Sequence, residues 1–248
     1  MLLIKFPNTS SDKLRSLSFW LAAEEYVGAH IGEILGDSGC DSAFFTWKVG
    51  PSVIFGHNQE VEAEVNVPYC AAEGIPLFRR KSGGGCVYAD EGNIMLSAIY
   101  GSGNVQFHFA SFLERLALSL RQLGFEAARS SRNDIIVDGR KVAGSACFVT
   151  PSASIVHSTL MYNLYIDRMV NAITPPAEKL ERHGVSSVRS RVANLKELMP
   201  SLVERSLISR VTACFCPEKR SFTLDASAIA EIEKAAETYL DPVFVMKK

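Results

Sequence analysis

The sequence predicts one α/β domain of the α+β kind, built around a mixed, largely antiparallel sheet, and three observations support this fold class. Short β-branched and aromatic runs dominate the chain up to residue 100 and helical patterns dominate after residue 165, so strands and helices do not alternate as they do around a parallel sheet. No repeat, low-complexity segment or long linker divides the 248 residues. A chain of this length buries roughly 70–75% of the surface of its unfolded state, which is enough for one large core.

The first hundred residues predict an opening helix followed by short strands. Apolar residues recur at near-helical spacing from residue 13 to about residue 31, behind candidate N-cap residues. Five β-branched or aromatic runs then predict strands at 43–47, 52–55, 77–78, 86–88 and 94–100. Because Gly50 and Pro51 separate the first two runs, we expect those runs to form a hairpin.

The second part of the chain predicts a long helix, a hairpin and a helical C-terminal region. A helix is expected over 105–123, because Phe112, Leu116 and Leu120 lie on one apolar stripe and Gly124 is placed to end it. Asp138 and Gly139 separate two β-branched runs, which is the signature of a hairpin. The remaining expected elements are a strand at 154–164 and helices at 167–172, 177–182, 202–214 and 226–239.

Composition and charge argue against several classes of protein. The chain carries 26 Lys and Arg against 27 Asp and Glu, a net charge of −1, which argues against a protein that coats nucleic acid. No apolar run approaches the about 20 residues that cross a bilayer, and the apolar block at 1–6 is too short for a secretory signal. We therefore expect no nucleic-acid or membrane partner, and a cytoplasmic location, or a mitochondrial one if the chain is eukaryotic.

The six cysteines show no disulfide framework, so we expect free thiols. Cys214 and Cys216 form a C-x-C pair, but no second Cys or His pair accompanies them at zinc spacing. Because the pair lies in an apolar stretch, buried core thiols are favoured over metal ligands.

A glycine run beside basic residues is the first candidate for chemistry. Arg79, Arg80, Lys81 and Ser82 precede three glycines, between two expected strands. Consecutive glycines weaken a strand, so such a segment is favoured where a ligand must approach bare backbone N–H groups. A glycine-rich surface turn with solvated basic flanks is the alternative. Neither the P-loop nor the dinucleotide-binding pattern occurs here.

A single lysine in the Asp-Gly hairpin is the second candidate. Lys141 lies two residues past the turn and is followed by the small residues Gly144, Ser145 and Ala146, which leave room for a ligand. Its ammonium group is suited to neutralising a phosphate or polarising a carboxyl oxygen. An exposed hairpin lysine is the alternative.

Four ordered segments together resemble the motifs of lipoate-protein ligases. Residues 79–93 read R-R-x-S-G-G-G-x-V-Y-x-D-x-G-N, and Asn133-Asp134 precede G-R-K-V-A-G-S-A at 139–146. Residues 157–163 read H-x-T-L-x-x-N, and 184–195 read G-V-x-S-V-R-S-R-V-x-N-L. One departure is Ala89, which stands where the family has a histidine.

The resemblance implies a fold and a reaction. The fold, shared with biotin-protein ligases, has a central mixed, largely antiparallel sheet flanked by helices, with a smaller second sheet. Residues 1–248 would form one catalytic domain without the family's C-terminal accessory domain. The reaction would use ATP and Mg²⁺ to convert lipoate to lipoyl-AMP. The lipoyl group would then pass to a lysine of a carrier domain, on E2 subunits of 2-oxoacid dehydrogenases or on the glycine cleavage H protein.

The resemblance also implies which residues bind and react. Lys141 would be catalytic, bridging the acyl carbonyl and the α-phosphate; Arg80 would hold phosphate, and Asp134 would be a magnesium ligand or an amine partner. The expected binding residues are Arg80, Gly83, Gly84, Gly85, Cys86, Val87, Tyr88, Asn133, Asp134, Lys141, Gly144, Ser145, Ala146, His157 and Thr159. Two interpretations of His157 stay open, a contact with the acyl tail and a satisfied strand histidine. Residues 187–191 either close over the nucleotide or connect helices.

Two other functions remain open. One is a transferase that takes lipoyl or octanoyl groups from a preformed adenylate or from an acyl carrier, in relatives through a cysteine nucleophile. No cysteine lies within 125–140, and the chain has Ile173-Thr174-Pro175-Pro176 where other transferases carry theirs. The other is a non-catalytic carrier-binding module, against which the retained charged residues argue. Lipoate or octanoate as substrate, and a separate small accessory protein as partner, are left open.

Overall fold

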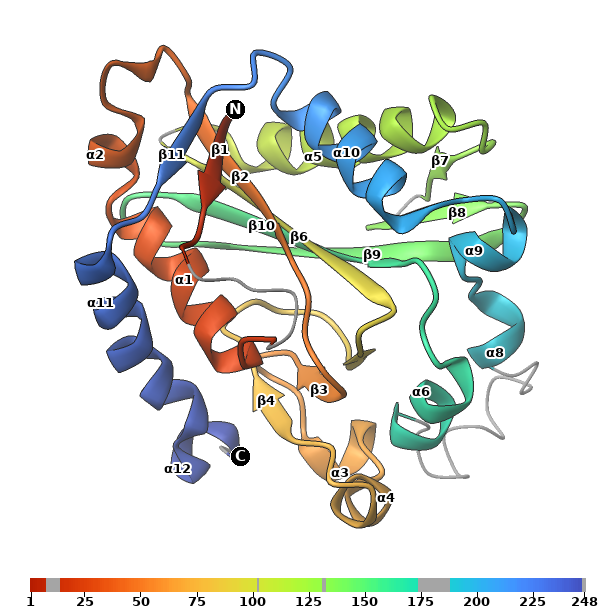
Figure 1. Ribbon diagram of the computed structural model, residues 1–248. Helices are drawn as coiled ribbons and strands as arrows, with labels where there is room; N and C mark the ends of the chain where they lie inside the picture. The colour runs from red at the N-terminus through yellow and green to blue at the C-terminus, as the bar shows by residue number, and fades with distance from the viewer. Residues whose placement is uncertain (8–13, 102, 131–132, 174–187, 247–248) are drawn as a thin grey trace.

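A large mixed sheet covered by helices on both faces, with a smaller sheet beside it, forms the molecule (Figure 1). The computed structural model describes residues 1–7, 14–101, 103–130, 133–173 and 188–246. On one face of the large sheet α1 packs beside α11, and on the other face α5 packs beside α10. The predicted fold class is therefore confirmed, including the second sheet that the family resemblance implied.

The large sheet has eight strands, in the spatial order β11-β1-β2-β6-β10-β9-β8-β7. The pairs β11·β1 and β1·β2 are parallel and the others are antiparallel. The bounds are Ser221–Thr223 (β11), Leu2–Lys5 (β1), Ser42–Trp47 (β2), Asn93–Tyr100 (β6), Ser154–Met161 (β10), Arg140–Val149 (β9), Asp134–Val137 (β8) and Ala128–Arg129 (β7). The small sheet has the order β4-β3-β5, with Leu77–Arg79 (β4), Ser52–Phe55 (β3) and Val87–Ala89 (β5).

Several helices, among them α1 and α11, begin at a capping side chain. Ser16 accepts a hydrogen bond from the Phe19 amide at 3.3 Å, and Asp225 accepts one from the Ala228 amide at 2.8 Å. The helices are Leu17–Ala29 (α1), Ile31–Leu35 (α2), Gly36–Ser38 (η1), Val61–Glu64 (α3), Val67–Ala72 (α4), Val105–Arg121 (α5), Ile166–Ile173 (α6), Val188–Arg191 (α8), Leu195–Leu198 (α9), Glu204–Phe215 (α10), Ala226–Ala236 (α11), Glu237–Leu240 (η2) and Pro242–Val245 (α12). None of these helices is long and apolar enough to cross a membrane, as far as the described ranges show.

Strand β6 lies at the centre of the large sheet, and all eight of its residues are buried. Met95 and Ile99 face the core under α1 and α11, whereas Leu96 and Ala98 face the core under α5 and α10. Alternation along the strand therefore fixes which side chains lie beneath α1. Ser97, on that same face, is paired in register with His157 of β10.

The expected hairpin of residues 43–47 and 52–55 is wrong. Strand β2 pairs with β1 and β6 in the large sheet, whereas β3 pairs with β4 and β5 in the small one. Gly50 and Pro51 do turn the chain, but both runs are almost fully buried and each has its partners elsewhere. A local turn signal therefore marks the break between the runs without specifying what either run pairs with.

The long helix and the Asp-Gly hairpin were confirmed, and the opening helix is shorter than expected. The helix at 105–123 is α5, and Gly124 follows it with φ +96. The Asp-Gly turn joins β8 to β9, with φ 50 at Asp138 and 73 at Gly139. The opening helix begins at Leu17 and breaks at His30 before α2. The helix expected at 177–182 lies outside the described residues. Strands β1 and β11 were not expected.

Candidate functional site

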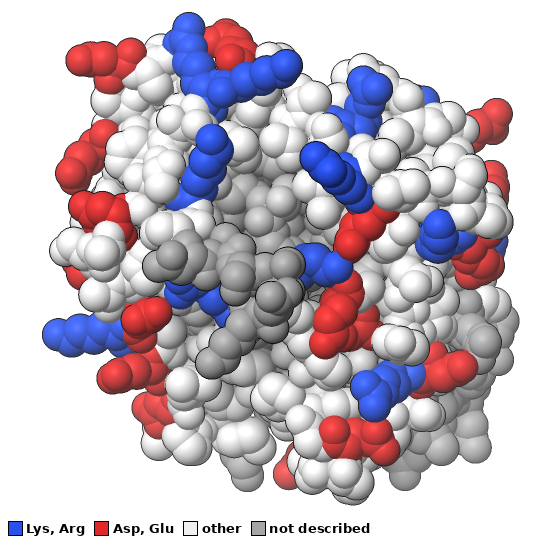
Figure 2. All heavy atoms as spheres, viewed as in Figure 1, with Lys and Arg blue, Asp and Glu red and all other residues white. Residues whose placement is uncertain are grey.

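A cavity of about 130 Å³ lies between the two sheets. Leu21, Trp47, Ile54 and Met95 form its apolar wall, and the glycine loop and strand β9 form its polar wall. On the face of the molecule viewed in Figure 1, Lys and Arg side chains border a hollow in the surface (Figure 2). An apolar pocket with a few convergent polar groups is the usual form of a small-molecule site.

Most of the predicted binding residues meet at this cavity. Those that line it are Arg80, Gly84, Gly85, Cys86, Val87, Asn133, Lys141, Gly144, Ser145, Ala146, His157 and Thr159. Gly83, Tyr88 and Asp134 do not line it. Tyr88 is 2% exposed and packs in the core of the small sheet, so its side chain supports the loop from behind.

The glycine loop folds closely against the chain at residues 56–57. A Cβ on Gly56 would lie 2.1 Å from the carbonyl oxygen of Gly84, so only glycine fits there. The His57 amide donates to the Ser82 carbonyl at 2.9 Å. Gly84 has φ +95, whereas a Cβ at Gly83 or Gly85 would meet nothing within 4 Å. The loop is therefore fixed on one side and open on the other.

Arg80 holds the loop in this shape. Its Nη2 donates to the carbonyls of Gly83 and Gly85 at 2.7 and 2.8 Å, and its Nη1 donates to the carbonyl of Ile54 at 3.2 Å. Burial lowers the pKa of Arg80 to about 10, so the guanidinium stays charged at neutral pH. The contact of Arg80 with a phosphate stays a prediction, because most of its N–H groups donate to backbone carbonyls of the protein.

Arg79 points away from the cavity and connects the small sheet to the C-terminal region. Its side chain is 1% exposed. Nε donates to the carbonyl of Val245 at 3.0 Å, and Nη1 donates to those of His57 and Gln59 at 2.8 and 2.9 Å. The first arginine of the pair is thus a structural residue, which the sequence pattern alone did not distinguish from Arg80.

A β-bulge places Lys141 on the cavity side of the hairpin. The register of β8 and β9 shifts between Ile135 and Ile136, so Lys141 and Gly144 lie on one face although they are three positions apart. A Cβ on Gly144 would lie 2.7 Å from Lys141 Nζ, so the ammonium occupies the space that this glycine leaves. Nζ lies 2.7 Å from Asp134 Oδ1, and the lysine side chain is 37% exposed.

The other polar residues of the cavity are held by the strands around them. Asn133 Nδ2 donates to the Ser145 carbonyl, and the Ser145 amide donates to the Asn133 carbonyl at 3.0 Å. Thr159 Oγ1 accepts from Asn93 Nδ2 at 2.7 Å. The Ala193 amide donates to the Lys141 carbonyl at 3.0 Å, so the described part of the last motif reaches the site through backbone pairing.

Cys86 is a poor nucleophile in this environment. Its side chain lines the cavity, and burial raises the pKa of its thiol to about 12. A reactive cysteine needs the thiolate at neutral pH, which requires a lowered pKa. Cys147, whose pKa burial also raises, has the same disadvantage.

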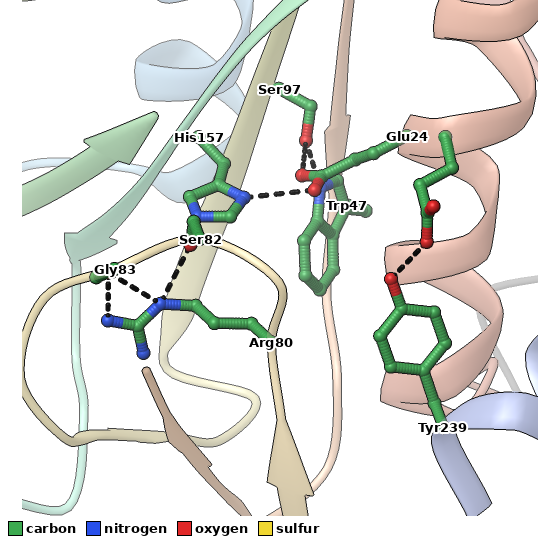
Figure 3. A network of polar contacts seen from close by, with 9 residues as sticks. Glu24, Trp47, Arg80, Ser82, Gly83, Ser97, His157 and Tyr239 are labelled. Atoms are coloured by element: carbon green, nitrogen blue, oxygen red, sulfur yellow. Dashed lines mark hydrogen bonds and ion pairs between the residues drawn. The ribbon is translucent and has the colours of Figure 1, made fainter. Parts of the chain in front are cut away.

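His157 is a satisfied strand histidine that also lines the cavity, and its contact with an acyl tail stays a prediction. Both ring nitrogens have partners: Nδ1 lies 2.9 Å from Glu24 Oε2, and Nε2 lies 2.8 Å from Ser82 Oγ (Figure 3). Glu24, Ser97 and Trp47 were missed by sequence reasoning. An acidic residue on the buried face of a mostly apolar helix was the available signal for Glu24.

The cavity can therefore accept a molecule with an apolar part and an anionic group. Lys141 supplies a cation and the open side of the glycine loop supplies bare backbone. Over the described ranges, no group of three or more His, Cys, Asp or Glu side chains is placed to hold a metal ion.

Comparison with known proteins gives this cavity a family context. The model of a family described as lipoyl protein ligase A/B catalytic domain matches residues 17–216. Lipoate-protein ligase LplJ of Bacillus subtilis is 41% identical over 181 residues, which cover 72% of this chain and 53% of that protein. Lipoate-protein ligase 1 of Staphylococcus aureus is 36% identical over 79% of this chain and 58% of its own. The chain thus spans a little over half the length of these curated relatives.

Solved structures share the fold at lower identity. A bi-partite lipoate protein ligase from Thermoplasma acidophilum, described with its E2 lipoyl domain, superposes with a TM-score of 0.82 at 23% identity, covering 99% of this chain and 95% of that one. A lipoate-protein ligase A bound with ATP gives a TM-score of 0.78 at 22% identity, covering 99% and 97% of the two chains.

Proposed function

This chain belongs to the family of lipoyl protein ligase A/B catalytic domains, and we propose that it activates lipoate with ATP to lipoyl-AMP and transfers the lipoyl group to a lysine of a carrier domain. One observation carries the proposal: a lysine ammonium faces a cavity that has an apolar wall and an open glycine loop. Lipoate has an apolar body, which suits the apolar wall, and one carboxylate, which suits the lysine ammonium. The names of the curated relatives and the ATP-bound structure of the same fold support it.

In the first step a carboxylate oxygen of lipoate attacks the α-phosphorus of ATP, and the bond to pyrophosphate breaks. Negative charge grows on the α-phosphate and the acyl oxygen, and Lys141 is placed to stabilise it. For this its ammonium must exchange Asp134, which it contacts at 2.7 Å, for the substrates. No covalent enzyme intermediate is needed.

Mg²⁺ belongs to the proposal as an ion carried by the nucleotide. Asp134 offers one carboxylate once Lys141 turns to the substrates, and Mg²⁺ is commonly held by one or two carboxylates together with phosphates and water. One carboxylate behind the cavity therefore fits a nucleotide-bound ion, and the described residues offer no group of three or more side chains that would hold an ion on their own. When bound, the ion would neutralise charge on the phosphates.

In the second step the ε-amine of a carrier lysine attacks the acyl carbonyl, the bond to the phosphate oxygen breaks, and AMP leaves. We propose lipoyl domains of E2 subunits and H protein as acceptors; the Thermoplasma ligase described with an E2 lipoyl domain supports the first. That ligase is described as bi-partite, which supports a separate accessory protein as a further partner. We place the reaction in the cytoplasm.

Cysteine-based transfer is disfavoured by the burial of the two thiols near the site. Burial raises the pKa of Cys86 to about 12 and also raises that of Cys147, so neither thiol supplies a thiolate at neutral pH. A non-catalytic module is disfavoured because Arg80, Lys141 and Asp134 are positioned at the cavity or directly behind it.

Lipoate-dependent exchange of pyrophosphate into ATP tests the proposal, with octanoate and biotin as alternative acids. Exchange by the purified chain supports a ligase that acts alone, and exchange only with an added accessory protein supports a two-protein ligase. Transfer to a lipoyl domain from supplied lipoyl-AMP, without exchange, supports the transferase. No reaction with either donor contradicts all three.

A further inference from the structure

A buried carboxylate lies beneath the cavity on α1. Glu24 is 0% exposed, and both of its oxygens have partners: Oε1 accepts from Ser97 Oγ at 2.6 Å, and Oε2 lies 2.9 Å from His157 Nδ1. In the part of the chain that the structure describes, no Lys or Arg side chain forms an ion pair with it. Burying a carboxylate is unfavourable unless donors satisfy it, so its position calls for a role.

The contacts continue from the carboxylate to three side chains that line the cavity (Figure 3). Trp47 Nε1 donates to Ser97 Oγ at 2.8 Å, on one side. On the other side Ser82 Oγ lies 2.8 Å from His157 Nε2, and Arg80 Nε donates to Ser82 Oγ at 2.9 Å. The indole, the imidazole and the guanidinium line the cavity, whereas the two hydroxyls lie behind it.

Counting donors gives these hydrogen bonds a direction. Ser82 Oγ already accepts from Arg80, so its own proton is free to be donated, and His157 Nε2 is the acceptor placed for it. In the same way Ser97 accepts from Trp47 and donates to the carboxylate. The hydrogen bonds can therefore all run toward Glu24 from both sides, and in that arrangement the imidazole carries its proton on Nδ1 and accepts at Nε2.

We propose that Glu24 is the positioning residue of this site. It fixes His157 in the Nδ1–H form and, through Ser82, holds the Arg80 guanidinium against the glycine loop. Glu24 does not line the cavity, so it acts through these neighbours. Serine, histidine and acid follow one another as in a hydrolase, but Ser82 is 0% exposed and does not line the cavity. Its hydroxyl therefore connects Arg80 to His157 by hydrogen bonds and is not a nucleophile.

The proton position is measured from the ring ¹⁵N chemical shifts of His157 in the ligand-free chain at neutral pH. His157→Asn identifies the signal among the five histidines. We expect a protonated Nδ1 and an unprotonated Nε2 in the wild type. Glu24→Gln should move the proton to Nε2, because the amide group then donates toward Nδ1. Ser82→Ala should leave the proton on Nδ1, because the carboxylate is intact. Glu33→Gln, at an exposed position of α2, is the matched control.

The kinetic part rests on the proposed function. Glu24→Gln should lower kcat/KM for lipoate in adenylate formation roughly 10–100-fold. Replacing a residue that orients a site residue from behind has an effect of this size in metal sites. Glu24→Asp should restore the Nδ1–H form and part of the rate. A wild-type imidazole protonated on Nε2 or on both nitrogens, or a Glu24→Gln chain that keeps Nδ1–H, overturns the inference. Because the tautomer is read without substrate, absence of adenylation contradicts only the proposed function.

Discussion

Replacing Gly144 by alanine should disable Lys141 while leaving the chain folded. A Cβ at position 144 would lie 2.7 Å from Lys141 Nζ and 2.8 Å from Cε, whereas Cβ contacts are ordinary only beyond 3.4 Å. The ammonium must therefore move outward by about 0.7 Å, and a misplacement of this order at a reacting centre costs up to about 10²-fold in rate. The clash is with the end of a flexible side chain, so the lysine swings away and the backbone stays.

The assay compares adenylate formation with stability. Gly144→Ala should lower kcat/KM about 10–100-fold, equivalent to roughly 1.4–2.7 kcal/mol of transition-state stabilisation, with an unchanged urea midpoint. Gly92→Ala places its Cβ 2.1 Å from the backbone oxygen of Asn163 and should lose stability. Gly32→Ala, within α2, meets nothing within 4 Å and should leave kcat/KM unchanged without any loss of stability. A Gly144→Ala chain with wild-type kcat/KM, or one as unstable as Gly92→Ala, would refute the role given to this glycine.

Three further outcomes are expected. Cys86→Ala should keep adenylation within about twofold, because burial raises the pKa of the thiol to about 12; a large loss would favour thioester chemistry. Between about pH 9 and 11 the free energy of unfolding, measured in urea, should fall less for Cys86→Ala than for the wild-type chain. The folded thiol keeps its proton to about pH 12 while the unfolded one loses it near 9.0, so rising pH favours unfolding by up to about 1.4 kcal/mol per pH unit; parallel stability curves would contradict this. Arg80→Lys should lower the free energy of unfolding by about 2–4 kcal/mol, because lysine cannot replace the donors to Ile54, Gly83 and Gly85; an unchanged urea midpoint would show that the loop does not depend on them.

Sequence reasoning predicted the elements whose signals are local. The stripe of α5 ended by Gly124 and the Asp138-Gly139 turn each depend on neighbours within a few residues, and both are present. The partners of β2 and β3 depend instead on which distant strands bury them, and the turn between them does not record that. Parallel pairing of β1 with β11 joins residues more than 200 positions apart, which no local pattern indicates.

The candidate site divides in the same way. Motif residues such as Lys141 and Gly144 were found because their chemistry and spacing are visible in the sequence. The bulge that puts them on one face was not, because it arises from the pairing with β8. Glu24 and Ser97 join His157 only after α1 packs on β6 and β10, so their role follows from tertiary structure.

Lys141 is tested most directly by lipoate-dependent exchange of pyrophosphate into ATP, measured for the wild-type chain and for Lys141→Ala in the same mixture. We expect exchange by the wild type and a loss of about 10²–10³-fold in the variant, the size found when a donor to a developing negative charge is removed. Urea denaturation should give the two chains similar midpoints, because the lysine side chain is 37% exposed. Lipoyl-AMP formation at the wild-type rate by Lys141→Ala would contradict the role of this lysine in acyl activation.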